Sequence, residues 1–321
     1  MTRALPLSML AVSLLPACGS NAAQPARPTP STSPDGASPS TAFSLLLVAE
    51  KKLSKLFSSK NLEHYEASGV VASSGALYVA SDNTTEIGVV DTSLDSGALG
   101  PGKATNSQYE AITATDDGRF YAMIESTSET DTRGAVAELD TTTAFVSQAF
   151  TDVQFAHVNK GFEGVAWVRL ADREYLLALC ENNDCMDDDS TPGNGRVKLL
   201  YLSGGVWTTQ QTLALPSSVA FLNYSDLALQ SQADGTFTVA VVSHKSSAMW
   251  QGTLSTSPWS ISGPGTFYAF PRTPDGAIQY CSVEGVSFLG PSVFAVVSDK
   301  ADGSTACNAK DESIHIFQTP L

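Results

Sequence analysis

Acidic side chains recur at two positions of a repeated pattern in this chain. A short phrase opens each repeat: Glu163-Gly164-Val165-Ala166-Trp167, Glu284-Gly285-Val286-Ser287 and Glu110-Ala111-Ile112-Thr113, with weaker copies at Ser68-Gly69-Val70-Val71 and Ser225-Asp226-Leu227-Ala228. An apolar run follows each phrase, and the residues that end these runs are Asp82, Glu125, Glu181, His244 and Asp299. Carboxylates in such numbers are ligands for hard divalent cations, or acids and bases for hydrolysis.

The elements that carry these residues read as short strands. In the second repeat, 112–114 alternates as a strand, Asp116-Asp117-Gly118 makes a turn, and Phe120–Ile124 forms an apolar second strand. Third and fourth strands follow at 135–139 and 144–150. The other repeats match, with second strands at 77–80, 175–179, 236–242 and 293–297, and third strands at 87–90, 197–202, 249–254 and 314–317. A strand repeat of roughly fifty residues predicts an all-β fold, a β-propeller.

The last repeat ends after its third strand, whereas the apolar run 43–48 lies before the first repeat without a partner. We expect this run to add as the outer strand of the last blade, which closes the ring and removes a free edge. The interpretation is a five-bladed propeller. Six blades are the alternative, with 43–57 forming more of a blade.

Propeller geometry gathers the repeated polar residues at one mouth of the central channel. The first strand of a blade is innermost and the second runs antiparallel to it, so the start of one and the end of the other share a face. The candidate metal ligands are Glu110, Glu163, Glu284, Asp82, Glu125, Glu181 and Asp299. The candidate ligand-binding residues are Ser68, Ser225, Asp226, His244, Lys245 and Lys300. Which of Ser225 and Asp226 faces inward stays open.

Like charges at short range raise pKa values, so these carboxylates require compensation. A bound divalent cation, Ca²⁺ first, is the expected cofactor because it suits flexible carboxylate cages. The alternative is structural: each Glu caps backbone N–H groups or faces solvent. The run Asp184-Cys185-Met186-Asp187-Asp188-Asp189 lacks the alternation of an EF-hand loop and is interpreted as a solvated acidic loop.

Nucleophilic catalysis has little support in the sequence. Ser243 and His244 are adjacent, and adjacent strand residues face opposite ways. The chain has no Gly-x-Ser-x-Gly elbow, no P-loop and no His-Glu-x-x-His. Trp167, Trp250 and Trp259 are expected to pack between blades.

The first residues are typical of a targeting segment. Arg3 precedes an apolar stretch from Ala4 to Leu15 that is too short to span a bilayer, and Leu15-Pro16-Ala17-Cys18 resembles the lipobox of bacterial lipoproteins. We expect residues 1–17 to be a signal peptide and Cys18 to be lipidated. An ordinary secretory signal is the alternative. The Pro-, Ser- and Ala-rich segment 18–41 reads as a linker, and 42–321 as the propeller domain.

Charge and cysteine content agree with a protein of the bacterial cell envelope. A net charge of −15 disfavours nucleic acid as a partner and favours cations. Apart from Cys18 there are four cysteines, as expected in an oxidising compartment; we predict the pairs Cys180–Cys185 and Cys281–Cys307 among three possible connectivities. We expect an extracytoplasmic monomer, lipid-anchored to the outer membrane.

The phrase at 163–167, the Ser-Gly-Val-Val opening at 68–71 and the strand endings Ser81-Asp82-Asn83 and Ser298-Asp299-Lys300 resemble a group of bacterial propellers, the SdiA-regulated and "esterase-like activity of phytase" proteins. Gluconolactonase and regucalcin type propellers, which use a Glu-Gly phrase as a metal ligand, are a more distant parallel. The resemblance covers roughly 66–317. It implies that Glu110, Glu163 and Glu284 are the central acidic positions. The fourth repeat departs from it, and one fold hosts many functions.

Two hypotheses of function follow. In the first, an anchored propeller binds a divalent cation and, through it, a small polar or anionic ligand or a partner. In the second, it is a metal-dependent phosphoesterase or lactonase, with the cation as Lewis acid and a ring carboxylate as base. Lys245 and Lys300 suit an anionic group, but no arginine cluster accompanies them. The first hypothesis is therefore preferred.

The anchor is testable on Cys18. Cys18→Ser removes the thiol that would carry the lipid, so this variant should move from the membrane fraction to the soluble fraction on cell fractionation. Retention of the variant in the membrane would contradict the lipobox interpretation.

Overall fold

The computed structural model describes residues 42–57, 64–102, 109–125, 130–158, 160–181, 185, 192–301 and 305–320. The chain divides into two units, Met1–Asp35 and Gly36–Leu321, and all described residues belong to the second. The expected signal peptide, the linker, Cys18 and most of the acidic loop lie outside the described residues. The expectations for them stay predictions.

The described strands form five antiparallel units of four strands each, one for each copy of the repeated phrase. From the innermost strand outward they are β3(Ala67–Ser73), β4(Ala76–Ser81), β5(Gly88–Asp91), β6(Gly97–Leu99); β7(Tyr109–Ala114), β8(Phe120–Ile124), β9(Arg133–Leu139), β10(Phe145–Gln154); β11(Phe162–Leu170), β12(Arg173–Cys180), β13(Arg196–Ser203), β14(Val206–Ala214); β15(Asp226–Ser231), β16(Phe237–Ser243), β17(Ala248–Thr256), β18(Trp259–Ala269); and β19(Val283–Gly290), β20(Val293–Ser298), β21(Ser313–Gln318), β2(Leu46–Lys52). Each unit is named below by its innermost strand.

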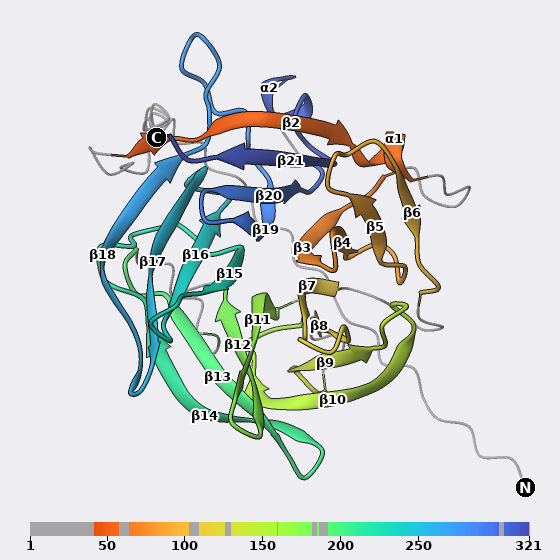
Figure 1. Cartoon of the computed structure of the whole chain (residues 1–321), viewed down its shortest axis with the longest axis vertical. Coiled ribbons are helices and arrows are strands. Elements are labelled where there is room, and N and C mark those ends of the chain that lie inside the picture. Colours follow the sequence, from red (N-terminus) through yellow and green to blue (C-terminus); the bar gives the residue numbers. More distant parts are fainter. Residues whose placement is uncertain are drawn as a thin grey trace, which may run out of the picture. The chain divides into compact units, whose positions relative to one another are not determined.

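The innermost strands β3, β7, β11, β15 and β19 surround the centre of the molecule (Figure 1). One parallel pair, Thr151 with Trp207, joins the β7 and β11 units into a single eight-stranded sheet. The all-β prediction is confirmed, and this division matches the five repeats of the sequence.

The N-terminal closure is confirmed in part and corrected in part. β2 pairs antiparallel with β21 and completes the β19 unit, as expected of a closing strand. The residues before it behave differently: β1(Phe43–Ser44) pairs in parallel with β18 of the neighbouring unit. The change of partner occurs at Leu45, whose side chain is 1% exposed and packs between the two units. Leu45 thus lies at the change from the first strand to the second, with its amide donating to the carbonyl of Ala269 at 2.9 Å.

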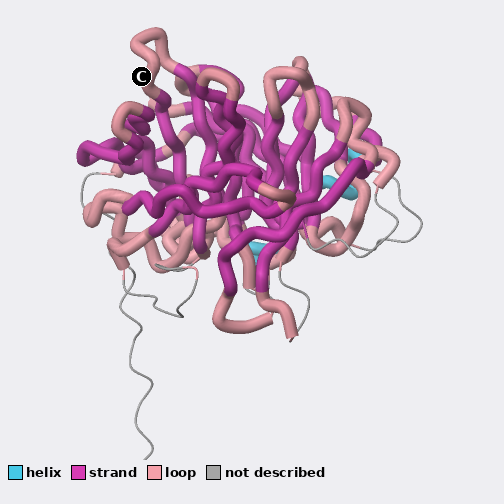
Figure 2. The backbone as a smooth tube through the Cα atoms, turned by 90° about the horizontal axis from the view of Figure 1, so that it is seen from below, coloured by secondary structure: helices cyan, strands magenta, loops and turns pink. Residues whose placement is uncertain are grey.

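Helices contribute little to the described structure. α1(Leu53–Leu56) and α2(Thr305–Asn308) each span four residues, and Figure 2 shows the rest of the described backbone as strands joined by loops and turns. No helix in the described part of the chain has the length and apolar character needed to cross a membrane.

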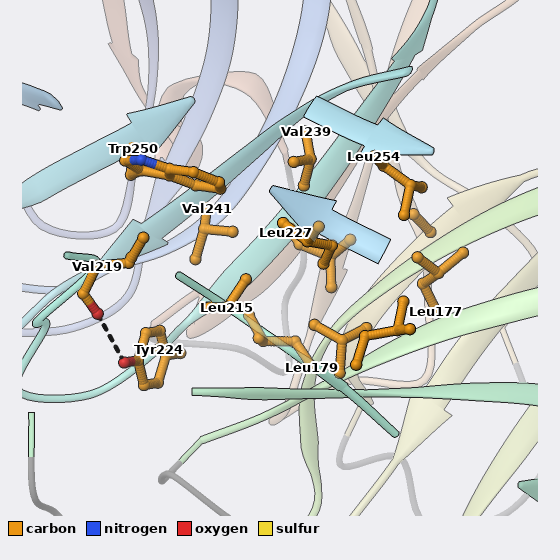
Figure 3. Packing of buried hydrophobic residues seen from close by; sticks show 14 of the residues in the cluster. Leu177, Leu179, Leu215, Val219, Tyr224, Leu227, Val239, Val241, Trp250 and Leu254 are labelled. Carbon is orange, nitrogen blue, oxygen red and sulfur yellow. Dashed lines mark hydrogen bonds between the residues drawn. The ribbon is translucent and has the colours of Figure 1, made fainter. Parts of the chain in front are cut away.

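Apolar side chains form the core between neighbouring units. Alternate residues of each innermost strand point to opposite sides, so one strand contributes to two neighbouring layers. The layer between the β11 and β15 units contains Leu177, Leu227, Val239 and Trp250 (Figure 3). Four other layers occupy the remaining contacts between units. The predicted packing role of Trp250 and Trp259 agrees with this layer.

Each innermost strand has one edge that faces the channel, and side chains form hydrogen bonds with some of the backbone N–H and C=O groups on that edge. Each contact between units has such a hydrogen bond. Ser68 Oγ donates to the carbonyl of Tyr109; Thr113 Oγ1 accepts from the amide of Trp167 at 3.0 Å; Ser287 Oγ accepts from the amide of Ala72 at 2.9 Å; and Asp226 accepts from the amides of Val165 and of Val286, the latter at 2.8 Å. These bonds join the five units around the channel.

Glycine allows the innermost strands to approach closely at the repeated phrase. A Cβ on Gly164 would lie 2.7 Å from the amide nitrogen of Leu227 and 2.8 Å from Cα of Asp226. A Cβ on Gly285 would lie 2.8 Å from the amide nitrogen of Val70, and one on Gly69 2.9 Å from Cα of Ala111. This level of close approach between neighbouring strands is called the narrow level below.

Gly164→Ala should lower the free energy of unfolding by about 1–3 kcal/mol, because the added methyl group meets backbone that cannot move independently. Gly290→Ala is the matched control. A Cβ there has no atom within 4 Å, so its effect should stay within about 0.5 kcal/mol. Equal unfolding midpoints for the two variants in urea would contradict the close approach.

Candidate functional site

The repeated glutamates lie at β-bulges. In the β11 unit, Phe162 pairs with Cys180 and Gly164 with Leu179, which leaves Glu163 as the extra residue. The same skip leaves Ser68, Glu110 and Glu284 unpaired in their units. A bulge redirects its side chain and ends regular pairing. These side chains therefore start at the channel mouth, ahead of the narrow glycine level.

The β15 unit shows which of Ser225 and Asp226 occupies the position of the repeated glutamate. Asp226 pairs with Val242, the register that Gly164 and Gly285 have in their units, so Ser225 takes the place of the glutamate. Both residues are buried, at 1% and 2% exposure. The carboxylate of Asp226 lies in the narrow level of the channel and accepts hydrogen bonds from three backbone amides, including that of Leu227.

The predicted strand-end residues gather at the same mouth. Asp82, Glu125, Glu181, His244 and Asp299 each directly follow a second strand. The amide of Asp82 donates to the carbonyl of Glu66 at 3.0 Å, and the amide of Asp299 to that of Ser282 at 2.8 Å, which holds each strand end beside the start of an innermost strand.

Two basic side chains pair with ring carboxylates. His244 Nδ1 lies 2.8 Å from Glu284 Oε1, and Lys160 Nζ lies 2.6 Å from Glu181 Oε2. Lys245 and Lys300 are exposed at the rim, and neither forms an ion pair within the described ranges. Part of the acidic ring is thus compensated by the protein, on the sides of the β11, β15 and β19 units.

Sequence reasoning missed three residues of this mouth: Glu66, Asn223 and Lys160. Glu66 acts electrostatically on Asp82 and on Asp299. Asn223 binds His244 and accepts hydrogen bonds from Ser243 and from the amide of Lys245. Glu66 and Asn223 both lie two residues before the ring position of their repeat, but the other repeats have Gln108, Gly161 and Ser282 there, so the spacing shows no consistent residue type. Lys160 lies in a connection without a repeated signal.

The residues Ser225, His244 and Glu284 meet but do not form a catalytic triad. Ser225 Oγ lies 3.1 Å from His244 Nδ1, the same nitrogen that faces Glu284, and Nε2 lies 3.3 Å from the amide group of Asn223. A relay needs the serine and the acid on opposite ring nitrogens. This group therefore orients His244 and does not activate the serine.

Burial and mutual repulsion raise the pKa values of the enclosed acids. Burial, followed by the charges of Glu125, Asp82, Glu284 and Asp299, raises the pKa of Glu110 well above its ordinary value. Burial and then Glu110 raise that of Glu163 in the same way. Chiefly through burial, the pKa of Asp82 is about 6, that of Glu125 about 7 and that of Asp299 about 8. These groups act on one another around one mouth.

The conformation of the ring is not that of an assembled metal site. Across the described residues, no three or more His, Cys, Asp or Glu side chains are arranged to hold a metal ion. The donor chemistry nevertheless fits a hard cation, because the central groups are carboxylates whose rotation requires only side-chain movement.

Both predicted disulfides are present. Cys180 and Cys185 are joined with their Cα atoms 4.9 Å apart, and Cys281 and Cys307 with theirs 5.4 Å apart. Cys180 ends β12 next to Glu181, so the first bridge fixes the chain beside the ring. Two disulfides agree with an extracytoplasmic, oxidising location.

No protein-family model matches the sequence, and no curated protein matches it. Solved structures are similar in fold. Glutaminyl cyclase from Myxococcus xanthus has a TM-score of 0.50 at 9% identity, over 88% of this chain and 100% of that one. The PQQ-bound aldose sugar dehydrogenase from Streptomyces coelicolor gives 0.43 at 12% identity, over 85% and 98%. Regucalcin from Agrobacterium tumefaciens, a calcium-binding protein, gives 0.40 at 14%, over 80% and 76%.

The five four-stranded units and the likeness in fold to the cyclase define the class: the chain has the fold of a β-propeller, and its similarity to known structures is distant. At these identities the likeness concerns the fold and neither the activity nor the number of blades. The narrower resemblance to the SdiA-regulated group stays an expectation.

The raised pKa values predict a stability that falls with rising pH in the presence of a chelator. The unfolded chain releases these protons near pH 4, whereas the folded protein releases them at about pH 6 from Asp82, about pH 7 from Glu125 and about pH 8 from Asp299, so stability is lost as pH rises from near 4 through these folded pKa values. Burial lowers the pKa of His315, which has the opposite sign but acts below about pH 6.5. The melting temperature should therefore drop between about pH 6.5 and about pH 8.

Glu110→Gln with Glu163→Gln should flatten this decline, because the substitutions remove two of the groups that bind protons only in the folded state. Calorimetry of both proteins in chelator decides the matter. If the melting temperatures of both proteins fell equally with rising pH, the ring acids would not be the cause of the decline.

Proposed function

We propose that the acidic mouth binds a divalent cation, Ca²⁺ first, and through it a small polar or anionic ligand. One observation carries the proposal: Glu110 and Glu163 are enclosed among other acids, and no described residue donates a hydrogen bond to either carboxylate or forms an ion pair with it. The charged form of an enclosed carboxyl group without a partner is costly, which agrees with the raised pKa values of both groups. A cation supplies the missing partner.

The existing ion pairs indicate which acids are available to the cation. Glu284 is held by His244 and Glu181 by Lys160, whereas Glu110, Glu163, Glu125 and Asp299 form no ion pair within the described ranges. These four acids come from the β7, β11 and β19 units. We assign them as the primary ligands, with Asp82, Glu284 and Glu181 as further members of the set.

The rim supplies contacts for the second component. Lys245 and Lys300 follow β16 and β20 and are exposed beside the ring. An anionic group on the cation would lie within the field of these ammonium groups. In this proposal the protein is a monomer of the cell envelope, is anchored by a lipid on Cys18 and resembles the SdiA-regulated group. Its two disulfides support only the extracytoplasmic location.

Calcium should raise the melting temperature, and a chelator should lower it, because binding to the folded state stabilises it by about 2.7 kcal/mol at a hundredfold excess over Kd. Binding should also release protons, since the cation replaces them on acids of raised pKa. Differential scanning calorimetry and a pH-stat titration with CaCl₂ measure the two effects.

Glu163→Gln with Glu284→Gln should abolish both responses while preserving side-chain shape. The matched control is Asp116→Asn with Asp172→Asn, which removes the same charge from exposed turns at the opposite ends of the strands. A wild-type protein that ignores calcium and chelator would refute the proposal, as would an equal loss of response in the control.

A further inference from the structure

One connection between two units brings a positive charge to the acidic mouth. Lys160 lies two residues before β11, in the connection from β10. Its Nζ atom lies 2.6 Å from Glu181 Oε2, and its charge also acts on Glu125. Glu181 directly follows the second strand of the β11 unit, and Glu125 that of the β7 unit. A single ammonium group therefore acts on acids of two neighbouring units.

The backbone of this connection is packed against Glu125. A Cβ on Gly161 would lie 3.2 Å from Cα and 3.5 Å from Cγ of Glu125, so this glycine brings the chain beside that acid. Phe155 and Phe162, at the two ends of the connection, are buried and stack edge to face with ring centroids 5.2 Å apart. Apolar contact thus closes the base of the connection and holds Lys160 at the mouth.

The charge of Lys160 opposes the same repulsion that a metal ion at the mouth would oppose. Burial raises the pKa of Glu163, and the charges of Glu181 and Glu125 are among the further causes. Burial also raises the pKa of Glu125 to about 7, while the charge of Lys160 acts in the opposite direction. Two positive charges among the same acids repel each other, so the ammonium group and a metal ion compete for this side of the mouth.

The lysine side chain is able to leave its position. It is 36% exposed, and its flexible stem carries a compact charge that water solvates strongly. Withdrawal from Glu181 therefore requires only side-chain movement, and the buried contacts at the base of the connection stay in place.

We propose that Lys160 is a built-in counter-ion of the mouth, which competes with a divalent cation for Glu125 and Glu181 and thereby sets the affinity for calcium. The inference rests on the cation site proposed above and adds the residue that regulates it. Without a metal ion, the ammonium group shields the two acids. When calcium binds, the side chain moves out to solvent. The loss of this ion pair reduces the net affinity, which places it in the range of extracellular calcium modules, about 10⁻⁴–10⁻³ M.

Removal of the charge should strengthen calcium binding. Lys160→Met keeps the aliphatic stem, and the metal ion then has no ammonium group to displace, so Kd should fall about tenfold. Lys160→Arg keeps the charge and should stay near the wild-type Kd. Isothermal titration of the metal-free proteins with CaCl₂, at one fixed pH and ionic strength, measures all three.

Two further variants test the location of the effect. Arg169→Met removes a positive charge from an exposed position at the opposite end of β11, so its Kd should change by less than about twofold. The gain from Lys160→Met should shrink when Glu125→Gln is already present, because one of the two acids that the lysine shields has then lost its charge. An equal gain in both backgrounds would overturn the assignment of Glu125.

A lysine with a structural role alone gives a different result. Lys160→Met would then lower the melting temperature in chelator and leave the calcium affinity unchanged or weaker. If this variant does not fold, Lys160→Gln, which is uncharged and polar, replaces it in every comparison.

The outcomes separate this inference from the proposed function. A wild type that binds calcium, with Lys160→Met binding no more tightly, overturns the role of the lysine and leaves the cation site standing. A wild type that does not bind, with Lys160→Met binding, supports the role of the lysine and contradicts the proposed function of the native chain. If neither protein binds calcium, both proposals are wrong.

Discussion

The inner edges of the five central strands impose the constraint on which the structure depends. A strand edge that faces a channel has backbone groups without partners, and a ring of five such edges must satisfy enough of them to stay closed. Asp226 does this for two contacts at once, because its carboxylate accepts from Val165 on one side and Val286 on the other. Serine and threonine side chains serve the remaining three. A buried acid thus acts as a structural acceptor.

The repeated phrase serves the fold and the site through adjacent residues. Its first residue lies at a bulge, where pairing skips one position and the side chain turns to the mouth. Its second residue is glycine in three of the five copies, and a Cβ on Gly69, Gly164 or Gly285 would lie within 2.9 Å of the backbone of the neighbouring strand. Substitutions at the two positions should therefore differ in effect. A larger residue in place of the glycine would push neighbouring strands apart, whereas a neutral residue in place of the glutamate would change only the charge at the mouth.

The periodic features were predictable from the sequence, and the contacts between repeats were not. Alternating apolar runs located the second and third strands, and the phrase located Glu110, Glu163 and Glu284 at one mouth. The role of Asp226 depends on a register without a bulge in one unit, which no composition signal distinguishes from its neighbours. The pairing of His244 with Glu284 joins residues from different units, so it follows only from their placement in space. The change of partner at Leu45 likewise depends on a gap between two units that a leucine fills.

The distribution of stability explains how the mouth tolerates so much charge. Five apolar layers between the units hold the ring together, and none of them contains an acid of the mouth. Repulsion among the acids therefore opposes folding locally, at strand ends and bulges, where few apolar contacts are lost when side chains move. The two acids that have basic partners, Glu181 and Glu284, belong to the β11 and β19 units, and acids without an ion pair in the described structure, such as Glu163 and Asp299, lie in the same units. A cation bound among these acids would reduce a repulsion that is already present in the folded protein. Little of its binding free energy would then be spent on ordering the site.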